Sequence, residues 1–270
     1  MPPAPAQPPE PSTLHQAFER NGPLDWGENA LTAADIARAH GAKASRKSLQ
    51  LLERTVALEP RITAQFLASL PPTASPYHLA SRVKSPDSLA RKIRNASAKR
   101  SRIPLDDVLR YTALTASSNE LVDAARHTID RLTDQGWRVT YAVQSYTDGS
   151  RYKGVHAYLA VPGIDRVEVQ FHSAASAKVK ELTTPWYEIE RSAHASKDER
   201  AARKKCVDLS ATLSAPPGID GLTELGGRTV AVCNYSDSRA RPVPPERLST
   251  SAPRATVHTP VTTKNDGMMR

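Results

Sequence analysis

Cysteine, aromatic side chains and long apolar runs are all scarce in this 270-residue sequence. The two cysteines, Cys206 and Cys233, form no CxxC pair and have no His at zinc-ligand spacing. This argues against a zinc site or a disulfide scaffold and favours reduced thiols. No stretch approaches the ~20 apolar residues of a membrane helix, and the Pro-rich start lacks the pattern of a secretory signal. We therefore predict a protein that acts in the cytoplasm without a membrane partner, with export as an effector left open.

Positive charge is in excess. The chain carries 37 Lys and Arg against 28 Asp and Glu, a net charge of +9, and 22 prolines. Such a balance favours an anionic partner such as a nucleotide, a nucleic acid or an acidic antitoxin. A merely solvated basic surface is the alternative.

Proline-rich stretches suggest how the chain is organised. We predict a disordered arm over 1–27, a helical extension over 28–75 and a catalytic domain over 76–212. An accessory strand with loops over 213–235 and a disordered basic tail over 236–270 follow. The run 71–76 is expected to be a linker, so truncation before Pro76 is expected to leave catalysis intact.

Within the central region the periodicity alternates between helix and strand. Ser85 with Pro86, and Ser117 with Glu120, are typical of helix starts. The remaining expected elements are strands over 108–115, 137–143, 155–161 and 166–171, and helices over 174–184 and 186–195. This order predicts an α+β fold with a small mixed β-sheet flanked by helices.

One strand of this sheet has an unusually polar face. Glu168 and Gln170 alternate with Val167 and Val169, so the two polar residues point to the same side. If the strands over 155–161 and 166–171 pair with their apolar faces in register, His156 joins Glu168 and Gln170 on one polar wall. An ordinary half-exposed hairpin is the alternative.

Cationic residues before and within the first central helix fit a phosphate chain. Arg82 and Lys84 precede a helix N-terminus, which favours anions, and Ser88 and Lys92 lie one turn apart. Together they could clamp phosphates, although a basic helix can also be simply solvated.

A metal site and an aromatic ring for base stacking are the remaining predicted parts of the site. Asp107 and Glu168 could hold Mg²⁺ through one or two carboxylates while substrate phosphates supply the other ligands. Tyr152, between Arg151 and Lys153, is expected to expose its ring for stacking on a nucleobase. An Asp-rich turn and a surface Tyr without function are the alternatives.

In their order and spacing these residues resemble the synthetase domain of RelA/SpoT homologues, especially the short alarmone synthetases and their toxic relatives. The resemblance covers roughly residues 75–195 and implies a nucleotidyltransferase-like fold. The matching residues are Arg82, Lys84, Ser88, Lys92, Asp107, Tyr152, Lys153, Gly154, His156, Glu168 and Gln170.

The resemblance also implies a role for each residue. Arg82, Lys84, Ser88 and Lys92 would bind ATP. Asp107 and Glu168 would bind Mg²⁺ and, with Arg82, form the catalytic group. The acceptor would be bound by Tyr152, Lys153, His156 and Gln170. The implied reaction moves the β,γ-pyrophosphate of ATP to a ribose 3′-hydroxyl and releases AMP.

Two departures from the family pattern leave the acceptor open. The strand that opens with Asp usually continues with Gly and then Arg, but here the run is Asp107-Val108-Leu109-Arg110-Tyr111-Thr112. The E-x-Q segment is usually followed by Arg-Thr, and here by Phe171-His172-Ser173. The acceptor could be a purine nucleotide, yielding (p)ppApp or (p)ppGpp, or the 3′-terminal adenosine of tRNA. The resemblance implies a growth-inhibiting toxin with an antitoxin or immunity partner, and the alternative is a decayed nucleotide- or RNA-binding module.

Overall fold

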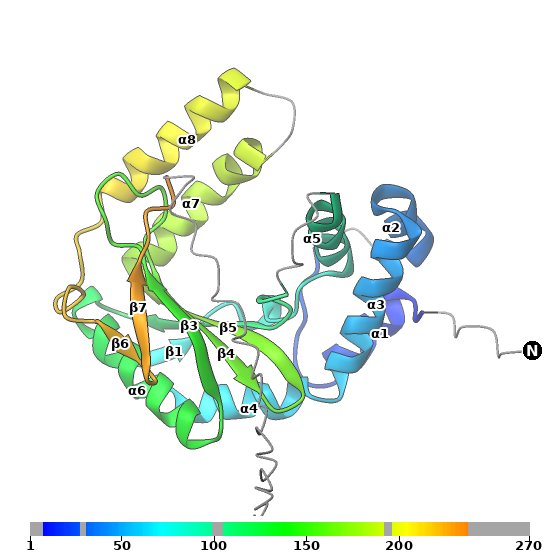
Figure 1. Cartoon of the computed structure of the whole chain (residues 1–270), viewed down its shortest axis with the longest axis horizontal. Helices are drawn as coiled ribbons and strands as arrows, with labels where there is room; N and C mark the ends of the chain where they lie inside the picture. The colour runs from blue at the N-terminus through cyan, green and yellow to red at the C-terminus, as the bar shows by residue number, and fades with distance from the viewer. Residues whose placement is uncertain (1–7, 28–30, 99–104, 192–195, 237–270) are drawn as a thin grey trace, which may run out of the picture.

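The computed structural model describes residues 8–27, 31–98, 105–191 and 196–236. A mixed sheet with the strand order β1-β2-β5-β4-β3-β7-β6 forms its centre (Figure 1). The β2–β5 and β3–β7 pairs are parallel and the other pairs are antiparallel. The strands are β1 (Ala74–Pro76), β2 (Arg110–Thr115), β3 (Arg138–Gln144), β4 (Val155–Val161), β5 (Ile164–Ser173), β6 (Glu224–Leu225) and β7 (Arg228–Val232).

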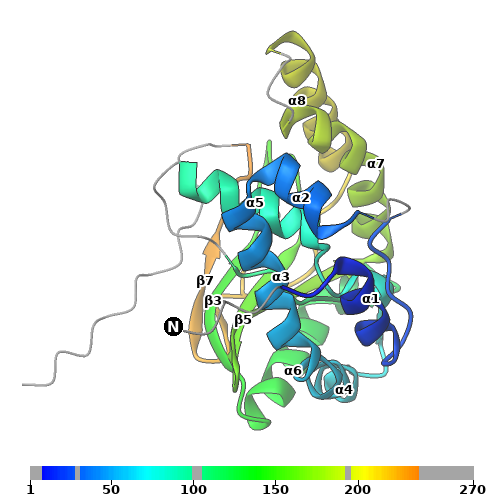
Figure 2. The same ribbon diagram turned by 90° about the vertical axis from the view of Figure 1, so that its right-hand side faces the viewer.

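Helices surround the sheet on three sides. Helices α4 and α6 lie under one face, α1 to α3 gather with α5 at one end, and α7 and α8 project at the other end (Figures 1 and 2). The predicted α+β fold is thereby confirmed. The helices are α1 (Pro11–Glu19), α2 (Ala33–His40), α3 (Ala42–Val56), α4 (Glu59–Ser69), α5 (Pro86–Ala98), α6 (Leu121–Asp134), α7 (Ala174–Arg191) and α8 (Ser196–Ala211). None of the helices in the described part of the chain is both long and apolar enough to cross a bilayer.

The helix starts expected from the sequence are present. Glu120 closes a capping box with Ser117 immediately before α6. At the start of α5, the Ser85 hydroxyl accepts a hydrogen bond from the Ser88 backbone N–H at 3.3 Å. These local contacts satisfy N–H groups that a helix leaves unpaired at its start, which is why the sequence could indicate them.

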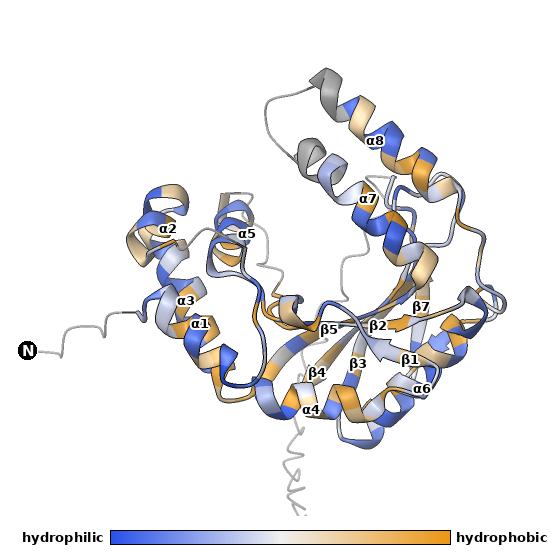
Figure 3. Ribbon diagram, turned by 180° about the vertical axis from the view of Figure 1, so that it is seen from behind, coloured by the Kyte–Doolittle hydropathy of each residue, from blue (hydrophilic) through white to orange (hydrophobic). Residues whose placement is uncertain are grey.

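The pleat separates an apolar from a polar face in the central strands. Val167, Val169 and Phe171 of β5 and Tyr111 of β2 are buried in the core, where α4 and α6 lie against the sheet (Figure 3). The expected alternation in β3 is interrupted, because a bulge shifts the register between Val139 and Tyr141. The opposite, polar face of the sheet is left for the site.

The N-terminal region belongs to the same core as the sheet. The prediction that 1–27 is a disordered arm is wrong for its second half, because α1 buries Leu14 and Phe18. Phe66 of α4 stacks on Tyr111 with a centroid distance of 4.8 Å. The expected linker also contributes β1, which pairs with β2. The core is therefore continuous across residue 76.

Two differences concern the C-terminal half. Helix α7 continues through Pro185 to Arg191, and the next helix is α8, so the predicted interruption and the helix over 186–195 are wrong. Packing against α8, including a contact from Cys206 Sγ to the Thr183 carbonyl at 3.7 Å, outweighs the local cost of proline. The expected strand after residue 213 is β7, which pairs with β3. Of the predicted tail over 236–270, residues 237–270 lie outside the described part of the chain.

Candidate active site

A cavity of about 660 Å³ opens on the polar face of the sheet. It lies between the start of α5, the turn before β2, the strands β4 and β5, and helix α7. The structure brings most of the predicted site residues to its walls. They are Lys84, Ser88, Lys92, Asp107, Tyr152, His156, Glu168 and Gln170.

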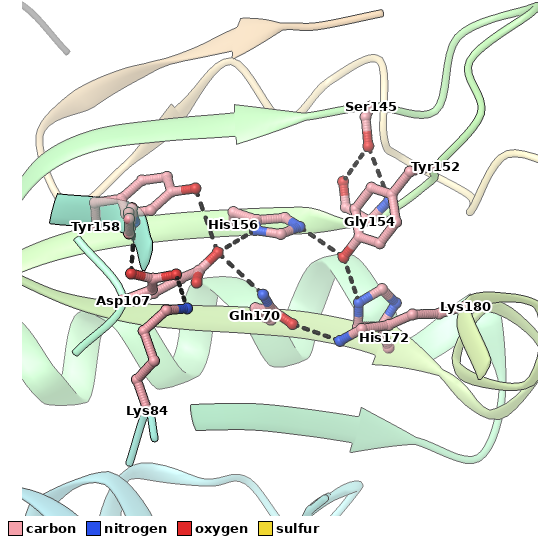
Figure 4. A network of polar contacts seen from close by, with 12 residues as sticks. Lys84, Asp107, Ser145, Tyr152, Gly154, His156, Tyr158, Gln170, His172 and Lys180 are labelled. Carbon is pink, nitrogen blue, oxygen red and sulfur yellow. Dashed lines mark hydrogen bonds and ion pairs between the residues drawn. The ribbon is translucent and has the colours of Figure 1, made fainter. Parts of the chain in front are cut away.

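Glu168 is the centre of the strand wall, because it contacts His156, Tyr158 and Gln170, which Figure 4 labels. Its Oε1 lies 2.7 Å from His156 Nδ1 and accepts from Gln170 Nε2 at 3.0 Å and from the Tyr158 hydroxyl at 3.3 Å. The antiparallel register places His156 opposite Gln170 and Tyr158 opposite Glu168, so the predicted polar wall is confirmed. Burial would raise the pKa of Glu168, but the His156 contact and Arg110 hold that pKa below its ordinary value.

Asp107 forms the second acidic group, in the turn before β2. Its two oxygens accept from Lys84 Nζ at 2.7 Å and from Lys92 Nζ at 2.6 Å. A bridge between Val83 and Leu109 holds the lysine segment beside this turn. Burial opposes ionisation of Asp107, and the two lysines outweigh it and lower its pKa.

The two carboxylates suit Mg²⁺ better than a metal held by protein ligands alone. The described residues contain no group of three or more His, Cys, Asp or Glu that could hold a metal. Asp107 and Glu168 nevertheless line one cavity and are close enough for the charge of Glu168 to oppose the net lowering of the Asp107 pKa. Mg²⁺ is commonly bound through one or two carboxylates together with water and substrate phosphates. The donor set fits that mode.

The ring of Tyr152 is less exposed than expected from the sequence. Its ring is half-buried, and its hydroxyl lies 2.7 Å from both His156 Nε2 and His172 Nε2 (Figure 4). The ring of Tyr235 stands nearly perpendicular to it at a centroid distance of 5.4 Å. Tyr152 is therefore held in place at the hydroxyl end while its ring still lines the cavity.

Two predicted residues do not reach the cavity. Arg82 is 1% exposed and donates to Glu59 Oε1 at 2.6 Å, so it does not line the cavity in which it was expected to bind ATP. The backbone at Arg82 is helical, so Arg82 and Lys84 do not share a face as they would in an extended segment. Lys153 donates to the Leu213 carbonyl at 3.0 Å and does not line the cavity either.

Two cations of the cavity were missed from the sequence. Arg110 is paired in register with Glu168 across β2 and β5. Lys180 of α7 donates to Gln170 Oε1 at 2.7 Å, and burial, reinforced by Arg110, lowers its pKa to about 8. The position of Arg110 follows from strand alternation once the pairing is known. The position of Lys180 depends on how α7 docks, for which the sequence gives no local signal.

Comparison with known proteins gives a structural likeness only. No family model matches the chain, and no curated protein matches it significantly in sequence. Among solved structures, the Type VI effector Tas1 in complex with its immunity protein is 14% identical with a TM-score of 0.38, covering 60% of this chain and 94% of that chain. The small alarmone synthetase 1 from Bacillus subtilis, bound to its product pppGpp, is 13% identical with a TM-score of 0.36, covering 59% and 88%.

A GTP pyrophosphokinase family protein from Streptococcus pneumoniae is 11% identical with a TM-score of 0.34, covering 66% of this chain and 89% of that chain.

Proposed function

We propose that this protein transfers the β,γ-pyrophosphate of ATP to the ribose 3′-hydroxyl of a nucleotide acceptor. One observation carries the proposal: Asp107 and Glu168 face a single cavity whose walls also carry Lys84, Lys92 and Lys180. Two carboxylates suit a metal ion, and lysines at this density suit the polyphosphate that such an ion accompanies. A cavity for an uncharged substrate would not need both sets of charges.

The chemistry assigned to the chain consists of positioning and charge neutralisation. The acceptor 3′-oxygen forms a bond to the β-phosphorus of ATP, the bond from that phosphorus to the α,β-bridging oxygen breaks, and AMP leaves. Glu168 orients the attacking hydroxyl and accepts its proton, while Lys84 and Lys92 bind the phosphate oxygens. Asp107 and Glu168 would hold Mg²⁺, which supplies charge neutralisation on the phosphates when bound.

For the acceptor we propose a purine nucleotide, giving an alarmone of the (p)ppApp or (p)ppGpp type. The half-buried ring of Tyr152 and the side chains of His156 and Gln170 line the part of the cavity beside Glu168. An aromatic ring in this position can stack on a base. The 3′ end of tRNA remains the alternative acceptor. A growth-inhibiting role, with an antitoxin or immunity protein as partner, stays a prediction.

Label transfer tests the proposal directly. Purified protein is incubated with [γ-³²P]ATP and Mg²⁺, and AMP, ADP, ATP, GDP, GTP and bulk tRNA are offered separately. Glu168→Gln and Asp107→Asn are expected to abolish transfer, whereas Asp130→Asn on the exposed face of α6 should leave it unchanged. Label in a nucleotide identifies the acceptor, and label in tRNA shifts the assignment to tRNA modification.

An absence of label transfer would contradict the proposal. If ATP binds but no acceptor receives label, the protein is a binding module and the enzymatic proposal fails. The toxic role has its own test, because induced expression should arrest growth with the wild-type chain and not with Glu168→Gln. Growth arrest by both the wild-type chain and Glu168→Gln would mean that the toxicity does not depend on catalysis.

A further inference from the structure

His172 is a fully buried histidine at the end of β5, and the roles proposed above leave it without one. Its Nε2 lies 2.7 Å from the Tyr152 hydroxyl and its Nδ1 lies 3.1 Å from Ser176 Oγ. The Tyr152 hydroxyl is also 2.7 Å from His156 Nε2, and His156 Nδ1 is 2.7 Å from Glu168. A continuous hydrogen-bond chain therefore runs from Ser176 to the carboxylate of the active site. Figure 4 shows its middle part, from His172 through Tyr152 to His156.

The donors and acceptors of this chain alternate in one direction if Tyr152 donates to His156. The Glu168 carboxylate only accepts, so His156 Nδ1 donates to it. The Tyr152 hydroxyl has one hydrogen; when this goes to His156 Nε2, the oxygen is left to accept from His172 Nε2. Burial holds the pKa of His172 well below its ordinary value, so this ring has a single N–H, and with that hydrogen on Nε2 its Nδ1 faces Ser176 as an acceptor. The Ser176 hydroxyl also donates to the Ser173 carbonyl at 3.2 Å. Every bond from Glu168 to His172 then has one donor and one acceptor.

We propose that His172 is a positioning residue, which fixes the Tyr152 hydroxyl and, through His156, the orientation of the Glu168 carboxylate. The proposal rests on the proposed function, because it treats Tyr152 as the acceptor platform and Glu168 as the group that receives the proton. Contacts with two imidazole rings hold the Tyr152 hydroxyl in place. The orientation of the Tyr152 ring is therefore fixed before the acceptor binds. Preorganisation of this kind reduces the cost of aligning the reacting groups.

The space around His172 supports a specific fit. A Cβ atom at Gly154 would lie 2.9 Å from His172 Cε1 and 3.0 Å from the Tyr152 oxygen. The Ser173 backbone N–H also donates to Ser176 Oγ at 3.0 Å, which anchors the far end of the chain at the start of α7.

The first test is spectroscopic and requires no turnover. In protein labelled with ¹⁵N-histidine, long-range ¹⁵N–¹H spectra distinguish the two neutral tautomers. We expect the hydrogen of His172 on Nε2 and that of His156 on Nδ1, with the His172 signals assigned by their loss in His172→Gln. A hydrogen on Nδ1 of His172 would reverse the chain and overturn the proposed direction.

The second test is kinetic. His172→Leu removes both hydrogen bonds and should lower kcat by about tenfold to a hundredfold, the range seen when second-layer partners are lost, with KM for ATP unchanged. His172→Gln retains a donor near the Nε2 position and should recover most of the rate. His127→Gln, at an exposed position of α6, is the matched control. Wild-type kcat in His172→Leu would contradict the proposal.

A double-mutant cycle separates positioning from general destabilisation. Once Tyr152→Phe has removed the hydroxyl, adding His172→Leu should cost little more, because the chain is already broken. Fully additive losses would mean that His172 acts independently of Tyr152. If the wild-type protein transfers no label, the proposed function fails, while the tautomers still decide whether the chain exists.

Discussion

Arg82 Nε donates to Glu59 Oε1 at 2.6 Å, and the side chains of both residues are almost completely buried. The remaining guanidinium hydrogens go to backbone carbonyls, including that of Phe18 at 3.2 Å. One arginine thus connects α1, α4 and the segment that leads into α5. A residue predicted to bind phosphate instead stabilises the contact between the N-terminal helices and the sheet.

Breaking this ion pair should destabilise the fold. Arg82→Met leaves the Glu59 carboxylate buried and unpaired, so we expect the free energy of unfolding to fall by about 3–5 kcal/mol. Urea denaturation measures the loss. The double variant Arg82→Met/Glu59→Leu should recover much of it, because no buried charge remains. If the double variant is as unstable as the single one, the charge is not the cause.

Removal of residues 1–75 should unfold the protein, contrary to the expectation that the extension is dispensable. The truncation deletes Glu59, the stacking partner Phe66 and Gln65, whose side chain accepts from Trp137 Nε1 at 3.0 Å. Circular dichroism and proteolysis should show loss of cooperative structure. Removal of residues 1–7 alone is the control. A folded, active truncated protein would contradict the shared core.

The affinity for ATP should weaken at alkaline pH through Lys180. Because the pKa of Lys180 is about 8, the side chain is charged at pH 7 and loses its charge as the pH rises. If the charge binds phosphate, KM for ATP should increase roughly tenfold between pH 7 and pH 9, the amount that titration of one group implies. Lys180→Arg keeps its charge and should flatten the profile. The same slope in both proteins would exclude Lys180 as a phosphate ligand.

Gly154→Ala should impair transfer more than it impairs folding. The added Cβ would lie within 3.0 Å of both His172 and the Tyr152 hydroxyl, so one of the two must shift. We expect kcat to fall by at least about tenfold, since displacements near 1 Å at a reacting site can cost a hundredfold. Gly221→Ala is the control, because its Cβ would meet only a backbone oxygen at 3.5 Å. Unchanged kcat in Gly154→Ala would count against a tightly packed wall.

The parts of the site that follow from strand pairing could be predicted from the sequence. Alternation placed Glu168 and Gln170 on one face, and the apolar pattern of the neighbouring strand fixed the register that adds His156. Asp107 and Lys92 could be connected through the resemblance, and they meet at 2.6 Å. Strand alternation was sufficient here because the residues concerned lie on two strands that follow each other in sequence and pair directly.

Long-range packing explains the features that could not be predicted from the sequence. Nothing within the residues near Arg82 indicates that a glutamate 23 positions earlier will hold its side chain. Pro185 similarly argued for a helix end, yet packing against α8 carries α7 onward. Contacts between residues this far apart in sequence decide between conformations that the local pattern leaves nearly equal in free energy.

The sheet ends on both sides in very short strands, β1 with three residues and β6 with two. One of the three β1 residues is Pro76, which has no backbone N–H to offer. Sheet edges are where another chain can add by strand pairing, and a short edge strand that contains proline discourages such pairing. A chain that added to the sheet beside β1 would therefore gain few backbone hydrogen bonds.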